Sequence, residues 1–104
     1  MKNCYGLSED AIQKIHSIFS KHPTVDKVIL YGSRAKGDYK PGSDIDLTIL
    51  SSTLDLSGLL KIENELDDLL LPYKIDLSIH SKIENVNLLD HIKRVGIIFY
   101  TRKT

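Results

Sequence analysis

The sequence predicts an α/β (α+β) fold, in which a small mixed β-sheet carries helices packed on one face. Three segments repeat apolar residues at helical spacing, and a short apolar run and two alternating segments lie between them. The resulting order is helix, strand, loop, strand, helix, strand, helix, which favours helices layered on a sheet whose opposite face is partly open. A chain of 104 residues suits one hydrophobic core. Residues 1–104 are therefore expected to form a single domain.

The first helix is expected to begin at Ser8, whose hydroxyl suits an N-cap, and to end near His22 and Pro23. Glu9 and Asp10 follow Ser8 and complement the positive end of the helix dipole.

The middle of the chain predicts two strands joined by a polar loop. Residues 27–31 form a short apolar run typical of a strand covered on both faces. Residues 32–42 are polar, contain three glycines and leave room for about one helical turn. Residues 43–50 then alternate between polar and apolar side chains, so one face of this strand is expected to be wet and acidic.

The C-terminal half predicts a helix over residues 55–71, an alternating strand over 73–80 and a last helix over about 84–95 that Gly96 ends. Residues 97–100 are compatible with an edge strand or with a packed tail, and the sequence does not decide between them.

The composition narrows the classes of protein. Fourteen basic residues balance fourteen acidic ones, so the sequence shows no direct nucleic-acid signal and no attraction to an anionic membrane. The single cysteine cannot form an internal disulfide, and no segment is as apolar as a signal peptide or a membrane helix. We therefore expect a soluble cytoplasmic protein, whose oligomeric state, a homo-oligomer included, stays open.

Three aspartates are the first candidate site residues. Alternation places Asp44 and Asp46 on the same face of their strand, and Asp76 on the polar side of another. Neighbouring carboxylates repel, and a bound cation relieves that repulsion. If the two strands are neighbours, Asp76 completes a three-carboxylate site. The alternative is three solvated surface aspartates.

Gly32 and Ser33 follow the apolar strand directly. At such a step backbone N–H groups can converge on phosphate oxygens, and the serine hydroxyl adds a donor. Taken alone, a Gly-Ser pair is equally compatible with a simple turn.

Together these pieces resemble the minimal nucleotidyltransferases of the polymerase β superfamily, a group that includes kanamycin nucleotidyltransferase. The resemblance lies in YGSRAKGDYKPGSDIDLTIL followed by KIDLSI, with ten residues between Ser33 and Asp44. It extends from about Val25 to His80.

The resemblance implies a role for each residue. Gly32 and Ser33 would bind the triphosphate of ATP, and Asp44 and Asp46 would ligate two Mg²⁺ ions. Asp76 would join Asp46 at the catalytic metal and take the proton of the attacking hydroxyl. Attack at the α-phosphorus would expel pyrophosphate.

Several polar loop side chains are open to more than one interpretation. Arg34 is the best candidate for a further phosphate ligand, whereas Lys36 and Lys40 are equally compatible with exposed loop charges. Tyr39 could stack on a base or simply be exposed.

The histidines are not assigned to the site. His16 and His91 are expected on helices that pack away from the acidic face. His80 follows the strand of Asp76 and is expected at a strand end near solvent.

In minimal nucleotidyltransferases the acceptor site is absent from the chain, and the resemblance implies a separate helical partner, a HEPN protein. The pair would act as toxin and antitoxin, this chain being the antitoxin that transfers AMP to a tyrosine hydroxyl of the toxin. Two alternatives remain: an inactive module that only binds a HEPN partner, and an enzyme that modifies a small molecule such as an aminoglycoside.

Overall fold

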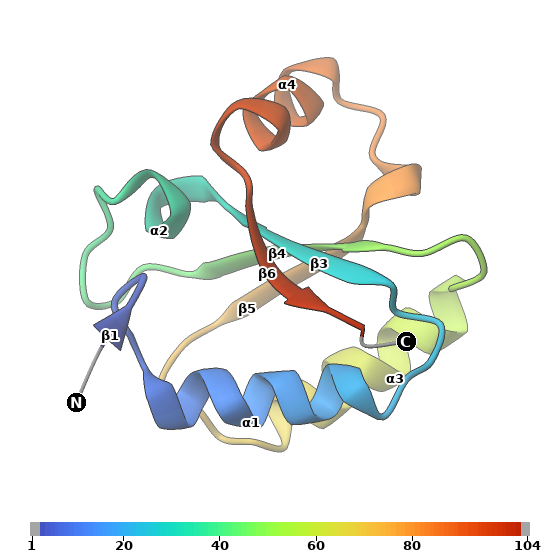
Figure 1. Cartoon of the computed structure of the whole chain (residues 1–104), viewed down its shortest axis with the longest axis horizontal. Coiled ribbons are helices and arrows are strands. Elements are labelled where there is room, and N and C mark those ends of the chain that lie inside the picture. The colour runs from blue at the N-terminus through green and yellow to red at the C-terminus, as the bar shows by residue number, and fades with distance from the viewer. Residues whose placement is uncertain (1–2, 103–104) are drawn as a thin grey trace.

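Four strands form one mixed sheet in the computed structural model, which describes residues 3–102 (Figure 1). The strands are β3 (Lys27–Tyr31), β4 (Ile45–Leu50), β5 (Ile75–Ile79) and β6 (Ile97–Thr101). Their order across the sheet is β5-β4-β3-β6, with β4 parallel to β5 and β3 antiparallel to both of its neighbours. The predicted fold class is confirmed, and residues 97–101 are an edge strand.

Two helices, α1 (Glu9–Ser20) and α3 (Leu56–Asp67), cover one face of the sheet, below it in Figure 1. Ser8 caps α1 as predicted, since its hydroxyl accepts a hydrogen bond from the Ala11 N–H at 3.1 Å. The core lies between these helices and the apolar side of β3 and β4. Its fully buried strand residues alternate along each strand, as period-two geometry requires: Val28, Leu30, Ile45, Leu47 and Ile49.

The last helix, α4 (Val86–Val95), lies on the other side of the sheet from α1 and α3 (Figure 1). It contacts β3 and the short helix α2 (Gly32–Lys36). The prediction of helices on one face alone is therefore wrong for α4, which covers part of the polar face. Sequence periodicity sets which side of a helix is apolar, but not which sheet face that side meets.

A small N-terminal hairpin is an unpredicted element. Strands β1 (Asn3–Cys4) and β2 (Leu7–Ser8) pair antiparallel across a turn at Tyr5 and Gly6, which have φ of 59° and 76°. Two positive φ angles in sequence are typical of a tight hairpin turn. Leu7 is fully buried and joins the core.

Helix α3 ends at Asp67, four residues before the predicted end at Leu71. Leu70 has a φ of 55°, and this left-handed residue turns the chain towards β5. A 3₁₀ turn, η1 (His80–Lys82), follows β5. No helix within residues 3–102 is long and apolar enough to cross a membrane.

Candidate active site

Asp46 and Asp76 are direct neighbours on the open face of the sheet. They are paired residues in the parallel β4–β5 ladder, so β4 and β5 meet the condition stated above for a shared carboxylate site. Tyr31 pairs with Asp46 from β3 and completes a row of three side chains across the strands. Asp46 is half-buried and Asp76 exposed, whereas Asp44 is exposed and precedes β4 by one residue.

The row concentrates negative charge. Burial raises the pKa of the Asp46 carboxyl, and the carboxylates of Asp76 and Asp44 raise it further. Burial also raises the pKa of the Tyr31 hydroxyl. A hydrogen bond with Ser78 lowers this pKa, and the carboxylates of Asp76 and Asp46 raise it further.

Gly32 lies directly against Asp46. Its φ of 75° is left-handed, and a Cβ at this position would collide with the Asp46 carboxylate. Only glycine permits both the backbone conformation and this close approach. The chain thus passes from β3 into α2 at the acidic row, and the half-buried Ser33 follows in the first turn of α2.

His91, on α4, contacts Gly32, contrary to the expectation that His91 packs away from the acidic face. The Gly32 N–H donates to its Nε2 at 3.1 Å, and its ring meets the Tyr31 ring edge-on at 6.1 Å between centroids. A sequence signal existed, because His91 follows Leu88 by three residues and precedes Ile92, and so belongs to the inward stripe of α4.

Arg34 corrects a second expectation. The side chain is 1% exposed, and its three guanidinium nitrogens donate to the carbonyl oxygens of Tyr5, Pro41 and Ser43. The guanidinium carbon lies 5.3 Å and 5.0 Å from the ring centroids of Tyr39 and Tyr73. Arg34 therefore ties the loop together through bonds to its backbone carbonyls.

The remaining loop cations are exposed. Lys36 pairs with Asp38 at 3.5 Å, and Lys40 faces solvent. Tyr39 is 36% exposed, and its ring packs against the Arg34 guanidinium. These side chains offer no defined phosphate ligand.

The donor set fits Mg²⁺, since carboxylate oxygens are its usual protein ligands and the crowded acids favour a cation. Within residues 3–102, no three His, Cys, Asp or Glu side chains are gathered closely enough to hold an ion by themselves. Mg²⁺ is commonly bound by one or two carboxylates, with substrate phosphates and water completing the shell. Asp46 and Asp76 provide such a pair.

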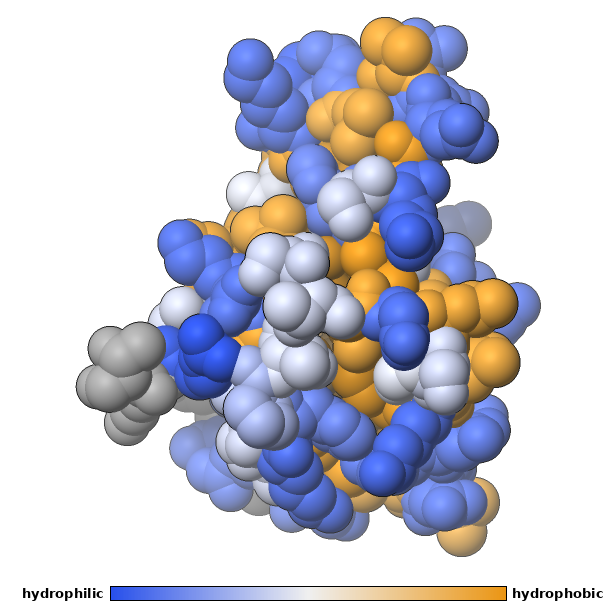
Figure 2. Space-filling model, turned by 90° about the vertical axis from the view of Figure 1, so that its right-hand side faces the viewer, coloured by the Kyte–Doolittle hydropathy of each residue, from blue (hydrophilic) through white to orange (hydrophobic). Residues whose placement is uncertain are grey.

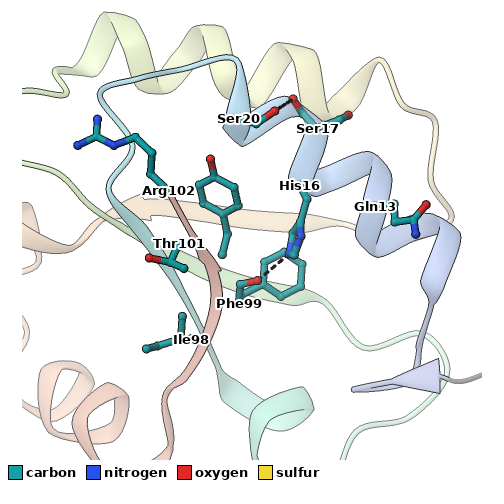
Figure 3. A pocket seen from close by; sticks show the side chains of 9 residues that line it. Gln13, His16, Ser17, Ser20, Ile98, Phe99, Thr101 and Arg102 are labelled. Carbon is teal, nitrogen blue, oxygen red and sulfur yellow. Dashed lines mark hydrogen bonds between the residues drawn. The ribbon is translucent and has the colours of Figure 1, made fainter. Parts of the chain in front are cut away.

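A cavity of about 690 Å³ lies elsewhere, between α1 and the edge strand β6. Figure 3 shows His16 pointing from α1 to the β6 backbone, where its Nε2 lies 2.6 Å from the Phe99 carbonyl oxygen. His16 thus covers an edge carbonyl and does not belong to the acidic site.

A cavity of about 570 Å³ lies under α4 and includes Ile29, Leu50 and His80. By strand alternation the side chains of Ile29 and Leu50 are on the same sheet face as Asp46. Figure 2 shows the corresponding notch, where α4 stands as a lobe above the body. His80 is half-buried here and was not assigned to the acidic site.

Residues 13–104 match the family model described as Polymerase beta, Nucleotidyltransferase. No curated protein matches the chain significantly.

Solved structures share the fold. A toxin–antitoxin complex with AMP-PNP contains a chain with a TM-score of 0.69 and 23% identity, the match covering 93% of this chain and 76% of that one. A complex of tri-AMPylated Shewanella oneidensis HEPN toxin with MNT antitoxin contains a chain with a TM-score of 0.65 and 20% identity, and the match covers 89% of this chain and 71% of that one. The MntA–HepT toxin–antitoxin complex contains a chain with a TM-score of 0.65 and 20% identity, and the match covers 90% of this chain and 73% of that one.

Proposed function

This chain belongs to the polymerase β nucleotidyltransferase family, and on that premise we propose that it transfers AMP from ATP to a tyrosine hydroxyl of a HEPN partner, as the antitoxin of a toxin–antitoxin pair. The observation that carries the proposal is the adjacency of Asp46 and Asp76 on the open sheet face, with Gly32 against the Asp46 carboxylate. Acids and phosphate loop thus meet at one point, as transfer of a nucleotide requires.

Each residue of the site has its own role in the proposed reaction. Gly32 and Ser33 orient the triphosphate: Gly32 allows the close approach of the chain, and Ser33 donates from its backbone N–H and its hydroxyl. Asp46 and Asp76, with Asp44 at the edge, hold Mg²⁺. The metal, when bound, neutralises phosphate charge and favours the deprotonated acceptor.

The transfer step is an exchange of one phosphorus–oxygen bond for another. The acceptor oxygen bonds to the α-phosphorus, the bond from that phosphorus to the β-bridging oxygen breaks, and pyrophosphate leaves with the bonding electrons. Asp76 takes the proton of the acceptor hydroxyl. Because Asp76 is exposed at the end of the row, an acceptor on another molecule can reach it.

The partner is supported by fold similarity alone. The similar complexes pair a toxin with an antitoxin, and one of them contains an AMPylated HEPN toxin. These chains share 20–23% identity with this one, so the acceptor has to be established by experiment.

The test is incubation with ATP labelled at the α-phosphate, Mg²⁺ and a HEPN protein encoded beside this chain. We expect label on a tyrosine of the HEPN protein, identified by mass spectrometry, and a loss of at least about 10³-fold for Asp46→Asn, which removes a shared charge from the site. Asp68→Asn, an exposed aspartate at the end of α3, is the matched control.

A stable complex without label transfer would show an inactive interaction module. Pyrophosphate release that depends on an aminoglycoside and needs no protein partner would show a small-molecule enzyme. Either result overturns the proposal.

A further inference from the structure

The contact between α4 and the start of α2 joins two segments that are 59 residues apart in the chain. The Gly32 N–H donates to Nε2 of His91 at 3.1 Å, and within residues 3–102 it donates no other hydrogen bond. A backbone N–H can only donate, so Nε2 carries the lone pair and the ring proton is on Nδ1. The bond therefore defines the neutral tautomer of His91.

This contact matters because Gly32 has little else to define its peptide orientation. The residue is left-handed, has no side chain, and follows Tyr31, which has no side-chain cap on α2. Glycine populates many backbone conformations, so an external partner is needed to select one. His91 supplies that partner from a separate helix.

The histidine ring is itself held in place. It meets the Tyr31 ring edge-on, with an interplanar angle of 80°, and it is half-buried. Its neighbour Ile92 is the buried residue of α4, and the Asn85 side chain caps the helix by accepting from the Leu88 N–H at 3.0 Å. The ring is thus presented by an ordered helix.

We propose that His91 is a positioning residue, which holds the Gly32 peptide so that Ser33 and the first turn of α2 face the triphosphate. The proposal rests on the proposed function for its effect on ATP. His91 does not act as a base or metal ligand in this arrangement, because its one lone-pair nitrogen is bonded to Gly32.

The consequence is a link between α4 and nucleotide binding. Since α4 has one buried residue and stands as a lobe above the sheet (Figure 2), its position depends on few contacts. A displacement of α4 would release the Gly32 peptide without touching any acid.

Two variants separate the hydrogen bond from the packing. His91→Phe keeps an aromatic ring against Tyr31 and loses the acceptor, whereas His91→Gln keeps an acceptor near the place of Nε2 and loses the ring. The first measurement is hydrogen exchange of the Gly32 amide in the ligand-free protein. We expect about five-fold faster exchange in His91→Phe and near wild-type protection in His91→Gln.

The second measurement is transfer kinetics. We expect His91→Phe to raise KM for ATP about five-fold, with kcat within about two-fold of wild type, and His91→Gln to restore KM. Unchanged amide exchange in His91→Phe would overturn the proposal, and so would an unchanged or lowered KM. A lowered KM would mean that His91 competes with the nucleotide for Gly32.

Failure of the proposed function has a different signature. In that case the wild-type protein transfers no label, while the amide exchange, which requires neither ATP nor a partner, still decides whether His91 holds Gly32.

Discussion

One loop connects two charged regions that are built in opposite ways. Arg34 is a buried cation whose nitrogens are bonded to backbone carbonyls and whose plane lies between two tyrosine rings. Asp46 is half-buried beside the Asp76 carboxylate, and its pKa is raised by burial and by neighbouring carboxylates. The cation is satisfied by the protein, and the anion is not.

This difference distinguishes a charge that stabilises the fold, at Arg34, from a charge that a ligand would compensate, at Asp46. Ion burial costs several kcal/mol unless hydrogen bonds compensate it, and at Arg34 they do. Unfavourable charge retained at a surface is typical of a site that a ligand completes. The sequence offered both groups as site residues, and only the structure shows that Arg34 is buried among backbone carbonyls.

The largest effect on stability is expected when the buried cation of Arg34 is removed. Arg34→Met keeps the side-chain stem and removes the guanidinium, so the carbonyls of Tyr5 and Ser43 lose their partner. We expect a loss of about 3 kcal/mol in the free energy of unfolding, measured by urea denaturation.

Lys36→Met is the matched control, because it removes an equal charge from the same helix at an exposed position and should change stability by less than about 0.5 kcal/mol. If Arg34→Met instead left stability unchanged and raised KM for ATP, Arg34 would be a phosphate ligand after all.

A smaller change in stability, of opposite sign, is expected when the charge of Asp46 is removed. The pKa of Asp46 is raised in the folded state, so its contribution to stability is present at low pH and is lost as pH rises through the folded pKa. At neutral pH Asp46→Asn should therefore be more stable than wild type by about 1 kcal/mol. The gain should shrink as pH falls towards about 4, which is close to the pKa of aspartate in the unfolded chain.

The measurement is urea denaturation of both proteins from pH 4 to pH 8, repeated with Mg²⁺. The metal should stabilise wild type more than Asp46→Asn, because ligands that bind only the folded state raise its stability. A gain that does not change with pH, or equal stabilisation of both proteins by Mg²⁺, would contradict the metal assignment.

The smallest effect is expected at Ser33. Ser33→Ala removes one hydroxyl donor and leaves the backbone donors in place, so we expect KM for ATP to rise about five-fold or less. Ser43→Ala does not serve as its control, since the Ser43 hydroxyl accepts from the Lys40 N–H. Ser57→Ala, on the exposed start of α3, does. An unchanged KM in Ser33→Ala would remove Ser33 from the phosphate loop.

Much of the fold followed from local pattern. The strand over residues 27–31 and the cap of α1 at Ser8 were predicted correctly, because alternation and N-cap chemistry act over a few residues. The end of α3 was predicted too late, since a left-handed leucine at position 70 has no sequence signature. The N-terminal hairpin is too short for a periodic signal.

The candidate site divides in the same way. Alternation by itself put Asp46 and Asp76 on polar strand faces, and the structure makes those strands parallel neighbours. Placement of the aspartates around Mg²⁺ and of ATP at Gly32 and Ser33 stays a prediction. His91 was misplaced and the burial of Arg34 was not foreseen, because the direction of each side chain depends on contacts with distant segments.

The sequence by itself determined which residues share a face, because backbone geometry gives each strand a period of two and each helix a period of 3.6. It thereby determined that three aspartates lie on polar faces near a glycine-bearing loop. Only the tertiary structure decided that α4 crosses to the acidic side, that His91 bonds to Gly32, and that Arg34 is buried. Those facts depend on packing between segments far apart in the chain, and no local pattern encodes which segment fills a given space.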